Sequence, residues 1–164
     1  MRDGVAAGSA SAGSGAGVRS NAAVNTLRDC RIVGNAASDT RSGVGEGGSS
    51  NRRIVVERCE ILGNTAVDDG GGIGTHGSGA DMVLDVIDGV IAGNTAGGEG
   101  GGIFRSATDG TTRVIQTLIE GNQALEAASF NGLGRRESGK QPASHGAGVW
   151  QLAGIPIEYR PSAE

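Results

Sequence analysis

The stretch Ile61-Leu62-Gly63-Asn64-Thr65-Ala66, followed closely by Gly70-Gly71-Gly72-Ile73, decides the fold because its parts recur along the chain. The dipeptide Gly-Asn occurs four times, and successive asparagines lie 29, 30 and 28 residues apart. An isoleucine precedes each asparagine by three positions, and an alanine follows it by two. The aligned asparagines and isoleucines are Asn35, Asn64, Asn94 and Asn122, with Ile32, Ile61, Ile91 and Ile119. A period of 28–30 residues over four copies predicts a solenoid of stacked repeats.

The local pattern within each repeat is that of strands. Runs of three consecutive glycines in two of the copies, at 70–72 and 100–102, disfavour the long helices of helical repeats. Cys30-Arg31-Ile32 and Cys59-Glu60-Ile61 alternate between less polar and more polar residues, which is typical of a strand with one buried face. The segments Ile54–Val56, Val83–Ile87 and Arg113–Ile115 are short and rich in β-branched residues. Each repeat is therefore predicted to contain a few short strands, with glycines in the turns.

Stacked units of this kind predict an all-β fold, a right-handed parallel β-helix of about four to five rungs. The right hand follows from the usual preference of parallel crossover connections. In-register stacking places each recurring residue next to its counterpart in the neighbouring rung. The isoleucines and alanines should form internal columns, and the asparagine amides should bond from rung to rung as a ladder.

Three regions are predicted along the chain. Residues 1–14 form a low-complexity lead-in, residues 15–157 form the β-helix, and residues 158–164 form a tail. Val149 follows Asn122 by 27 residues, whereas the equivalent residue follows the earlier asparagines by nine, so an insertion is expected at about 125–144. Insertions in repeat proteins often form binding loops, although a solvated loop without a ligand is the alternative. The candidate binding residues of this loop are Phe130, Arg135, Arg136 and Lys140.

Composition limits the classes of partner. The chain has 164 residues, enough for one domain, and 32 of them are glycine. A net charge of −4 argues against nucleic acid as a partner. No apolar run approaches the ~20 residues of a membrane-spanning helix. The N-terminus carries no targeting signal, so either the protein stays in the cytoplasm or a leader or further repeats precede Met1. We expect the second.

Cys30 and Cys59 occupy the same repeat position, 29 residues apart. Parallel in-register side chains suit a disulfide poorly, so a stacked, reduced and buried pair is expected. A zinc site is not expected, because His76 and His145 lie far away in sequence and no Cys-x-x-Cys is present.

Acidic residues follow each of the first three asparagines by four or five positions. They are Asp39, Asp68, Asp69 and Glu99. Stacking would place their carboxylates along one edge, where hard oxygen ligands can bind Ca²⁺. The alternative is a solvated turn surface, and no other cofactor is expected.

A polysaccharide lyase would also need a base near such a metal. Arg52, Arg53, Arg105 and Arg113 could lie on outer faces, but no spacing singles one out. A glycosidase would need two carboxylates at a fixed separation, and Asp85 and Asp88 share one strand region without a recognisable catalytic phrase.

The Gly-Asn-x-Ala and Gly-Gly-(Ala/Gly)-Ile elements, as in Ile61–Ala66 and Gly70–Ile73, resemble the repeats of bacterial right-handed β-helix proteins. The similarity is to polymorphic-outer-membrane-protein and pectate-lyase-like repeats. It implies an exported protein, at the bacterial cell surface or extracellular, and no catalytic residues carry over.

The leading hypothesis is a non-catalytic segment of such a protein, acting as stalk, adhesin or passenger. Its candidate partners are a surface glycan or a protein, bound by the flat outer sheet or by the 125–144 loop. End-to-end self-association is also expected. The alternatives are a carbohydrate-active enzyme, either lyase or glycosidase, and a fragment without independent function.

Overall fold

The computed structural model describes most of the repeat region. The described residues are 5–6, 16–20, 22–38, 43–47, 52–76, 82–105, 110–125, 149–151 and 157–160. Residues for which only the backbone is described are 5–6, 46–47, 76, 149–151 and 157–160.

The described residues form 19 short strands and no helix, and the strands pair in parallel into four sheets. Sheet I contains β3 (Val24–Arg28), β7 (Arg53–Glu57), β11 (Met82–Ile87), β15 (Gly110–Ile115) and β19 (Ile157–Arg160). Sheet II contains β4 (Arg31–Val33), β8 (Glu60–Leu62), β12 (Val90–Ala92) and β16 (Leu118–Glu120). Sheet III contains β1 (Val5–Ala6), β5 (Ala36–Ala37), β9 (Thr65–Ala66), β13 (Thr95–Ala96) and β17 (Gln123–Ala124). Sheet IV contains β2 (Val18–Ser20), β6 (Val44–Gly47), β10 (Ile73–His76), β14 (Ile103–Arg105) and β18 (Val149–Gln151).

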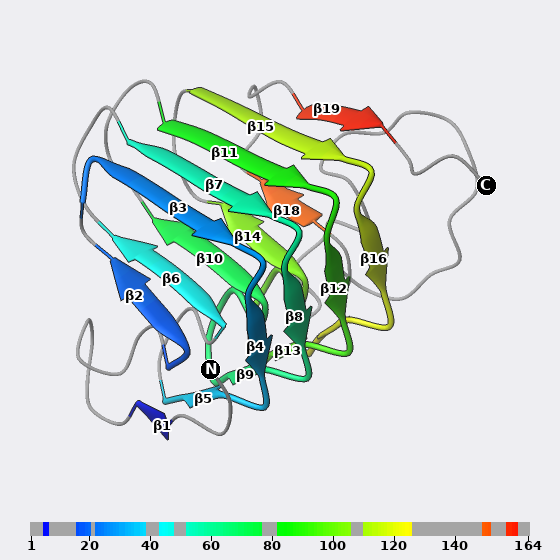
Figure 1. Ribbon diagram of the computed structural model, residues 1–164. Coiled ribbons are helices and arrows are strands. Elements are labelled where there is room, and N and C mark those ends of the chain that lie inside the picture. The colour runs from blue at the N-terminus through cyan, green and yellow to red at the C-terminus, as the bar shows by residue number, and fades with distance from the viewer. Residues whose placement is uncertain are drawn as a thin grey trace.

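The chain visits the sheets in the fixed order I, II, III, IV, and each strand pairs with its counterpart one repeat away (Figure 1). Ile61 lies opposite Ile32 on one side and Ile91 on the other, as the repeat predicts. Val149 lies opposite Ile103, so the strand after the long insertion returns to its expected position. This stacking of parallel strands fits a parallel β-helix or solenoid. No helix of the described part is long and apolar enough to cross a membrane.

Strand pairing reaches past two of the predicted boundaries. Val5–Ala6 forms β1 and pairs with β5, so the 1–14 lead-in already contributes a strand. Ile157–Arg160 forms β19 and pairs with β15, so the last strand extends into the predicted tail of 158–164. Both pairings follow from backbone hydrogen bonding, because the edge of a sheet offers unpaired N–H and C=O groups to an extended chain.

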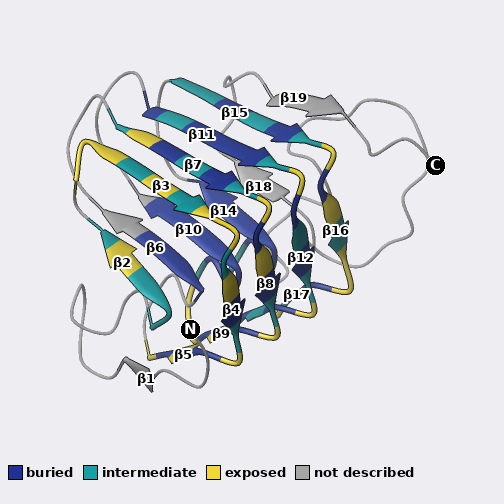
Figure 2. Ribbon diagram, viewed as in Figure 1, coloured by how far each residue is buried: buried dark blue, intermediate teal, exposed yellow. Residues whose placement is uncertain are grey.

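The core is a set of side-chain columns inside the four sheets, and burial is greatest in the middle repeats (Figure 2). Ile61, Ile73 and Ile103 have no exposed surface, and Ile91 is 1% exposed. Only the end members of the columns lose burial, as Ile119 does. Short β-branched side chains fill this narrow interior, which explains why so few aromatics suffice.

The four asparagines are buried and hydrogen-bonded from repeat to repeat. Nδ2 of Asn35 donates to Oδ1 of Asn64 at 2.8 Å, and the same bond joins Asn64 to Asn94 and Asn94 to Asn122. Each acceptor oxygen also receives the backbone N–H of the preceding asparagine, at 2.9–3.0 Å. Nδ2 of Asn64 bonds in addition to the carbonyl of Ile32. Each inner amide therefore satisfies its own polar atoms and those of its neighbours, as the spacing predicts.

Residues with a left-handed backbone conformation (positive φ) form two corners of every repeat. The glycine of Gly-Asn turns the corner between sheets II and III, with φ between 59° and 66°. The corner between sheets I and II is turned by residues that carry side chains, with φ between 48° and 52°. These residues are Asp29, Arg58, Asp88 and Gln116.

Arg105 is buried inside the molecule, so it does not take the place on an outer face that the sequence allowed. Its guanidinium donates to Thr112 Oγ1 and to the Met82 carbonyl, both at 2.7 Å. Gly110 makes room for it, because a Cβ there would lie 2.7 Å from the Arg105 Nη2. Burial lowers the pKa of Arg105 to about 10.

Candidate functional site

The outer face of sheet I, formed by the outward side chains of β3, β7, β11 and β15, combines charged and apolar groups on a flat surface. Alternation along each strand turns one set of residues into the core and the next set outward, as in β7, where Ile54 and Val56 are buried. The half-buried apolar side chains of this face are Val55, Val83, Ile87 and Ile115. Register places them on neighbouring strands, with Ile87 opposite Ile115.

Asp85 lies at the centre of this face, covered by two arginines. Asp85 is 1% exposed although its side chain points outward from β11. Arg113 on β15 bonds to both carboxylate oxygens, at 2.6 and 2.9 Å, and Arg53 on β7 bonds to Oδ2 at 2.9 Å. The arginine side chains keep 54% (Arg53) and 36% (Arg113) of their surface exposed. A buried carboxylate therefore fixes two solvent-facing guanidinium groups.

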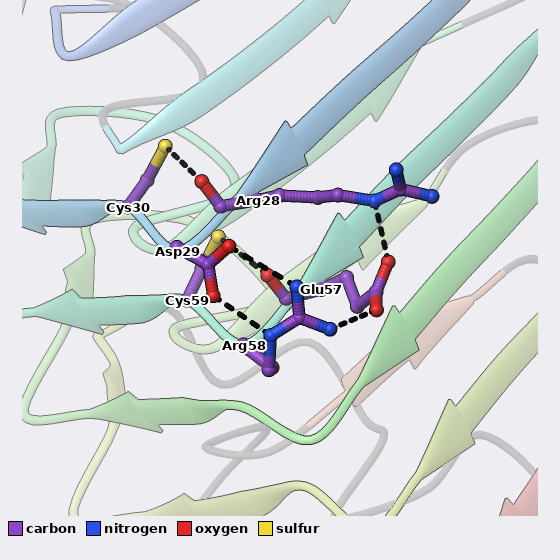
Figure 3. Close-up of polar contacts among 6 residues, drawn as sticks. All are labelled: Arg28, Asp29, Cys30, Glu57, Arg58 and Cys59. Carbon is purple, nitrogen blue, oxygen red and sulfur yellow. Dashed lines mark hydrogen bonds and ion pairs between the residues drawn. The ribbon is translucent and has the colours of Figure 1, made fainter.

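A second charged cluster surrounds the corner between sheets I and II (Figure 3). Arg58 bonds to both oxygens of Asp29, at 2.7 and 3.1 Å, and also to Glu57. Arg28 bonds to the other oxygen of Glu57, at 2.6 Å. The four residues come from adjacent repeats, and stacking alternates positive and negative charge along the corner.

The ion pairs of this corner keep its groups charged. The hydrogen bond from Arg58 lowers the pKa of Asp29, and the hydrogen bond from Arg28 lowers the pKa of Glu57. The hydrogen bonds to Asp29 and Glu57 raise the pKa of Arg58. A general acid needs a raised carboxyl pKa, and an arginine base needs a lowered one, so these shifts oppose proton transfer near neutral pH.

The two cysteines directly follow the corner residues Asp29 and Arg58 in adjacent repeats, and both are free (Figure 3). Cys59 is buried, whereas Cys30 is only half-buried because it belongs to the first full repeat. Burial raises the pKa of the Cys59 thiol, which lowers its reactivity. The expected stacked pair is thus present, with one member less buried than expected.

The acidic residues proposed as calcium ligands are only partly brought together. The Asp69 carboxylate accepts the backbone N–H of Glu99 at 2.7 Å, while Asp68 is exposed. Asp39 lies outside the described residues. Within the described parts of the chain, no three acidic, histidine or cysteine residues gather closely enough to hold a metal ion.

The candidate binding loop also lies outside the described residues. It comprises Phe130, Arg135, Arg136 and Lys140.

Sequence reasoning missed the cluster around Asp85 and the cluster around Arg58. Neither has a motif, since all but one of the pairs join residues 28 to 32 positions apart, and the residue types at these positions differ between repeats. Aligning the repeats as columns would have placed Asp29 beside Arg58 and Asp85 beside Arg113.

The chain matches no protein-family model, no curated protein and no solved structure.

Proposed function

We propose that the chain is a non-catalytic segment of a bacterial cell-surface or secreted protein, a stalk, adhesin or passenger built as a right-handed parallel β-helix of about four to five rungs. It binds a glycan or a protein through the outer face of sheet I. The resemblance of its repeats to those of exported bacterial β-helices supports the location.

The observation that carries the proposal is the set of exposed arginines fixed in place on this face and at its corner with sheet II. Arg28, Arg53, Arg58 and Arg113 are each held by a carboxylate of a neighbouring strand or corner. Guanidinium groups held in advance lose little conformational entropy when a partner binds. Half-buried apolar side chains lie beside them, and this combination is typical of interfaces.

A binding role is favoured over catalysis because the carboxylates on and beside this face already form ion pairs with arginines. Both oxygens of Asp85 accept hydrogen bonds from arginine. Asp29 and Glu57 have lowered pKa values, so they remain ionised near neutral pH. The buried Cys59 thiol has a raised pKa and is a poor nucleophile.

The test is binding of the labelled chain to a panel of acidic and neutral polysaccharides and bacterial surface proteins. Arg28→Glu reverses a charge on the outer face of sheet I, where the side chain is 61% exposed and pairs with Glu57. Arg31→Glu is the matched control on sheet II, since Arg31 is 67% exposed and pairs with Glu60 in the same way. We expect Arg28→Glu to weaken binding of the retained ligand about tenfold or more and Arg31→Glu to change it less than about twofold.

Equal effects of the two variants, or no binding to any panel member, would contradict the proposal. Release of sugar products that stops with a calcium chelator, and also with Asp68→Ala plus Asp69→Ala, would instead establish the lyase alternative.

A further inference from the structure

We infer that the corner between sheets I and II carries, in the third and fourth repeats, a docking surface for a short protein segment with aliphatic and basic side chains. This surface, called the corner patch, consists of four outward aliphatic residues and two acidic residues. They are Ile87, Val90, Ile115 and Leu118, with Asp88 and Glu120. The inference rests on these outward side chains and is independent of the ligand proposed for the arginines of sheet I.

The corner patch is continuous across two sheets. Ile87 ends β11 and lies opposite Ile115, which ends β15. Val90 begins β12 and lies opposite Leu118, which begins β16. Because β12 and β16 follow β11 and β15 directly around the corner, the two aliphatic pairs lie on either side of it (Figure 1). Leu118 is 47% exposed and the other three are half-buried, so aliphatic surface remains for a partner to cover.

The fold does not require aliphatic residues at these positions. In the first two repeats the column of Ile87 holds Arg28 and Glu57, and the column of Val90 holds Arg31 and Glu60. Both charged pairs form ion pairs between repeats, with Nε–Oε2 distances of 2.6 and 2.7 Å. Stacking therefore accepts charged pairs at the corner, so packing within the protein does not account for the aliphatic pairs of the later repeats.

The charges of the corner also change between the two halves. Asp88 and Glu120 are exposed, and within the described residues their carboxylates make no hydrogen bond or ion pair. Arg58 holds the position of Asp88 one repeat earlier, but it bonds to Asp29 and Glu57. The corner acids of the first two repeats are thus paired with arginine, whereas those of the corner patch are available to cations of a partner.

A segment with aliphatic and basic side chains complements this surface. Its aliphatic groups would cover the ridge formed by the two aliphatic pairs, and its lysine or arginine side chains would pair with the two carboxylates. Interfaces between whole domains use about 20–30 residues on each side, so a patch of this size suits a short segment better.

The experiment titrates the whole chain into a labelled short peptide in which leucine and lysine alternate, and fluorescence anisotropy measures binding. Two comparison peptides replace every leucine by serine or every lysine by glutamate. Leu118→Lys places a like charge in the corner patch, and Val67→Lys is its control, because Val67 is 66% exposed in the turn after β9. Circular dichroism reports whether each variant is folded, and Leu118→Thr replaces Leu118→Lys if the latter is not.

Asp88→Asn tests the charge of the corner patch. Asparagine tolerates the positive φ of 52° at this position, so the backbone is preserved. Asp68→Asn is the matched control, since Asp68 is also exposed and its replacement changes the net charge equally.

We expect the leucine–lysine peptide to bind about tenfold or more tightly than either comparison peptide. Leu118→Lys should weaken this binding about tenfold, and Asp88→Asn about threefold, with the effect of Asp88→Asn shrinking as salt is added. Val67→Lys and Asp68→Asn should each change it less than about twofold. No binding of the leucine–lysine peptide, equal binding of the serine–lysine peptide, or equal losses in the patch variants and their controls would overturn the inference.

Discussion

Two corners of each repeat reach the same left-handed backbone conformation with opposite chemistry. The corner between sheets II and III uses glycine in every repeat, while the corner between sheets I and II uses residues with side chains. A Cβ in this conformation costs about 1–2 kcal/mol. The glycine corner avoids this cost, whereas the other corner accepts it and gains charge pairs such as that between Arg58 and Asp29. The comparison shows that stacking can impose a backbone shape that the local residues do not favour.

The largest effect should follow from Asn64→Ala, beside the glycine corner. Asn64 accepts two hydrogen bonds from Asn35 and donates to Asn94 and to the Ile32 carbonyl, all in the buried interior. Its loss leaves several buried polar groups without partners, so we expect the free energy of unfolding to fall by about 3 kcal/mol or more. Urea unfolding measures this.

The control for this variant is Gln123→Ala, one residue after the ladder position and exposed. A loss for Gln123→Ala as large as for Asn64→Ala would mean that the ladder does not account for the effect.

A smaller loss is expected for Gly63→Ala. Gly63 has φ 59°, and a Cβ added there would meet no atom within 4 Å. The cost is therefore conformational alone, about 1–2 kcal/mol in urea unfolding. No change in stability would show that glycine is dispensable at this corner.

The reciprocal substitution, Gln116→Gly, should stabilise the protein. Gln116 has φ 48° and is exposed, so glycine relieves the backbone cost without opening a cavity. The greater freedom of glycine in the unfolded chain offsets part of this gain, which leaves a net increase below about 1 kcal/mol. Destabilisation measured in the same urea assay would contradict the strain assigned to this corner.

The smallest expected effect is a loss of stability at acidic pH. Asp29 and Glu57 have pKa values lowered from their ordinary 3.8 and 4.5, so their contribution to stability is present above these values. It is lost as the pH falls below them towards the folded-state pKa values. Arg58→Gln should raise the pKa of Asp29 more than that of Glu57, because Arg28 remains the main partner of Glu57. Carboxyl NMR titration measures both.

Arg31→Gln serves as the control for this titration, since Arg31 lies on sheet II and pairs with Glu60. A pKa of Asp29 that is the same with and without Arg58 would remove the ion pair as its cause.

The same difference between corners explains which features could be predicted from the sequence. Gly63-Asn64 repeats its residue types in every copy, so the glycine corner and the asparagine ladder were predictable. Asp29, Arg58, Asp88 and Gln116 share a position, but the residue type changes from each repeat to the next, so nothing marked the second corner. The Arg58 cluster was unpredictable for the same reason, because its partners come together only through the register of the strands.

The sequence by itself determined the repeat, the short strands and the buried columns, since burying one face of a strand requires apolar residues at regular spacing. Only the tertiary structure decided where the buried charged residues lie. Arg105 lies in the interior because Thr112 and the Met82 carbonyl accept its hydrogen bonds there. Asp85 is covered because arginines on the two flanking strands reach over it. Both placements depend on contacts between different strands, and only the stacked structure brings those strands together.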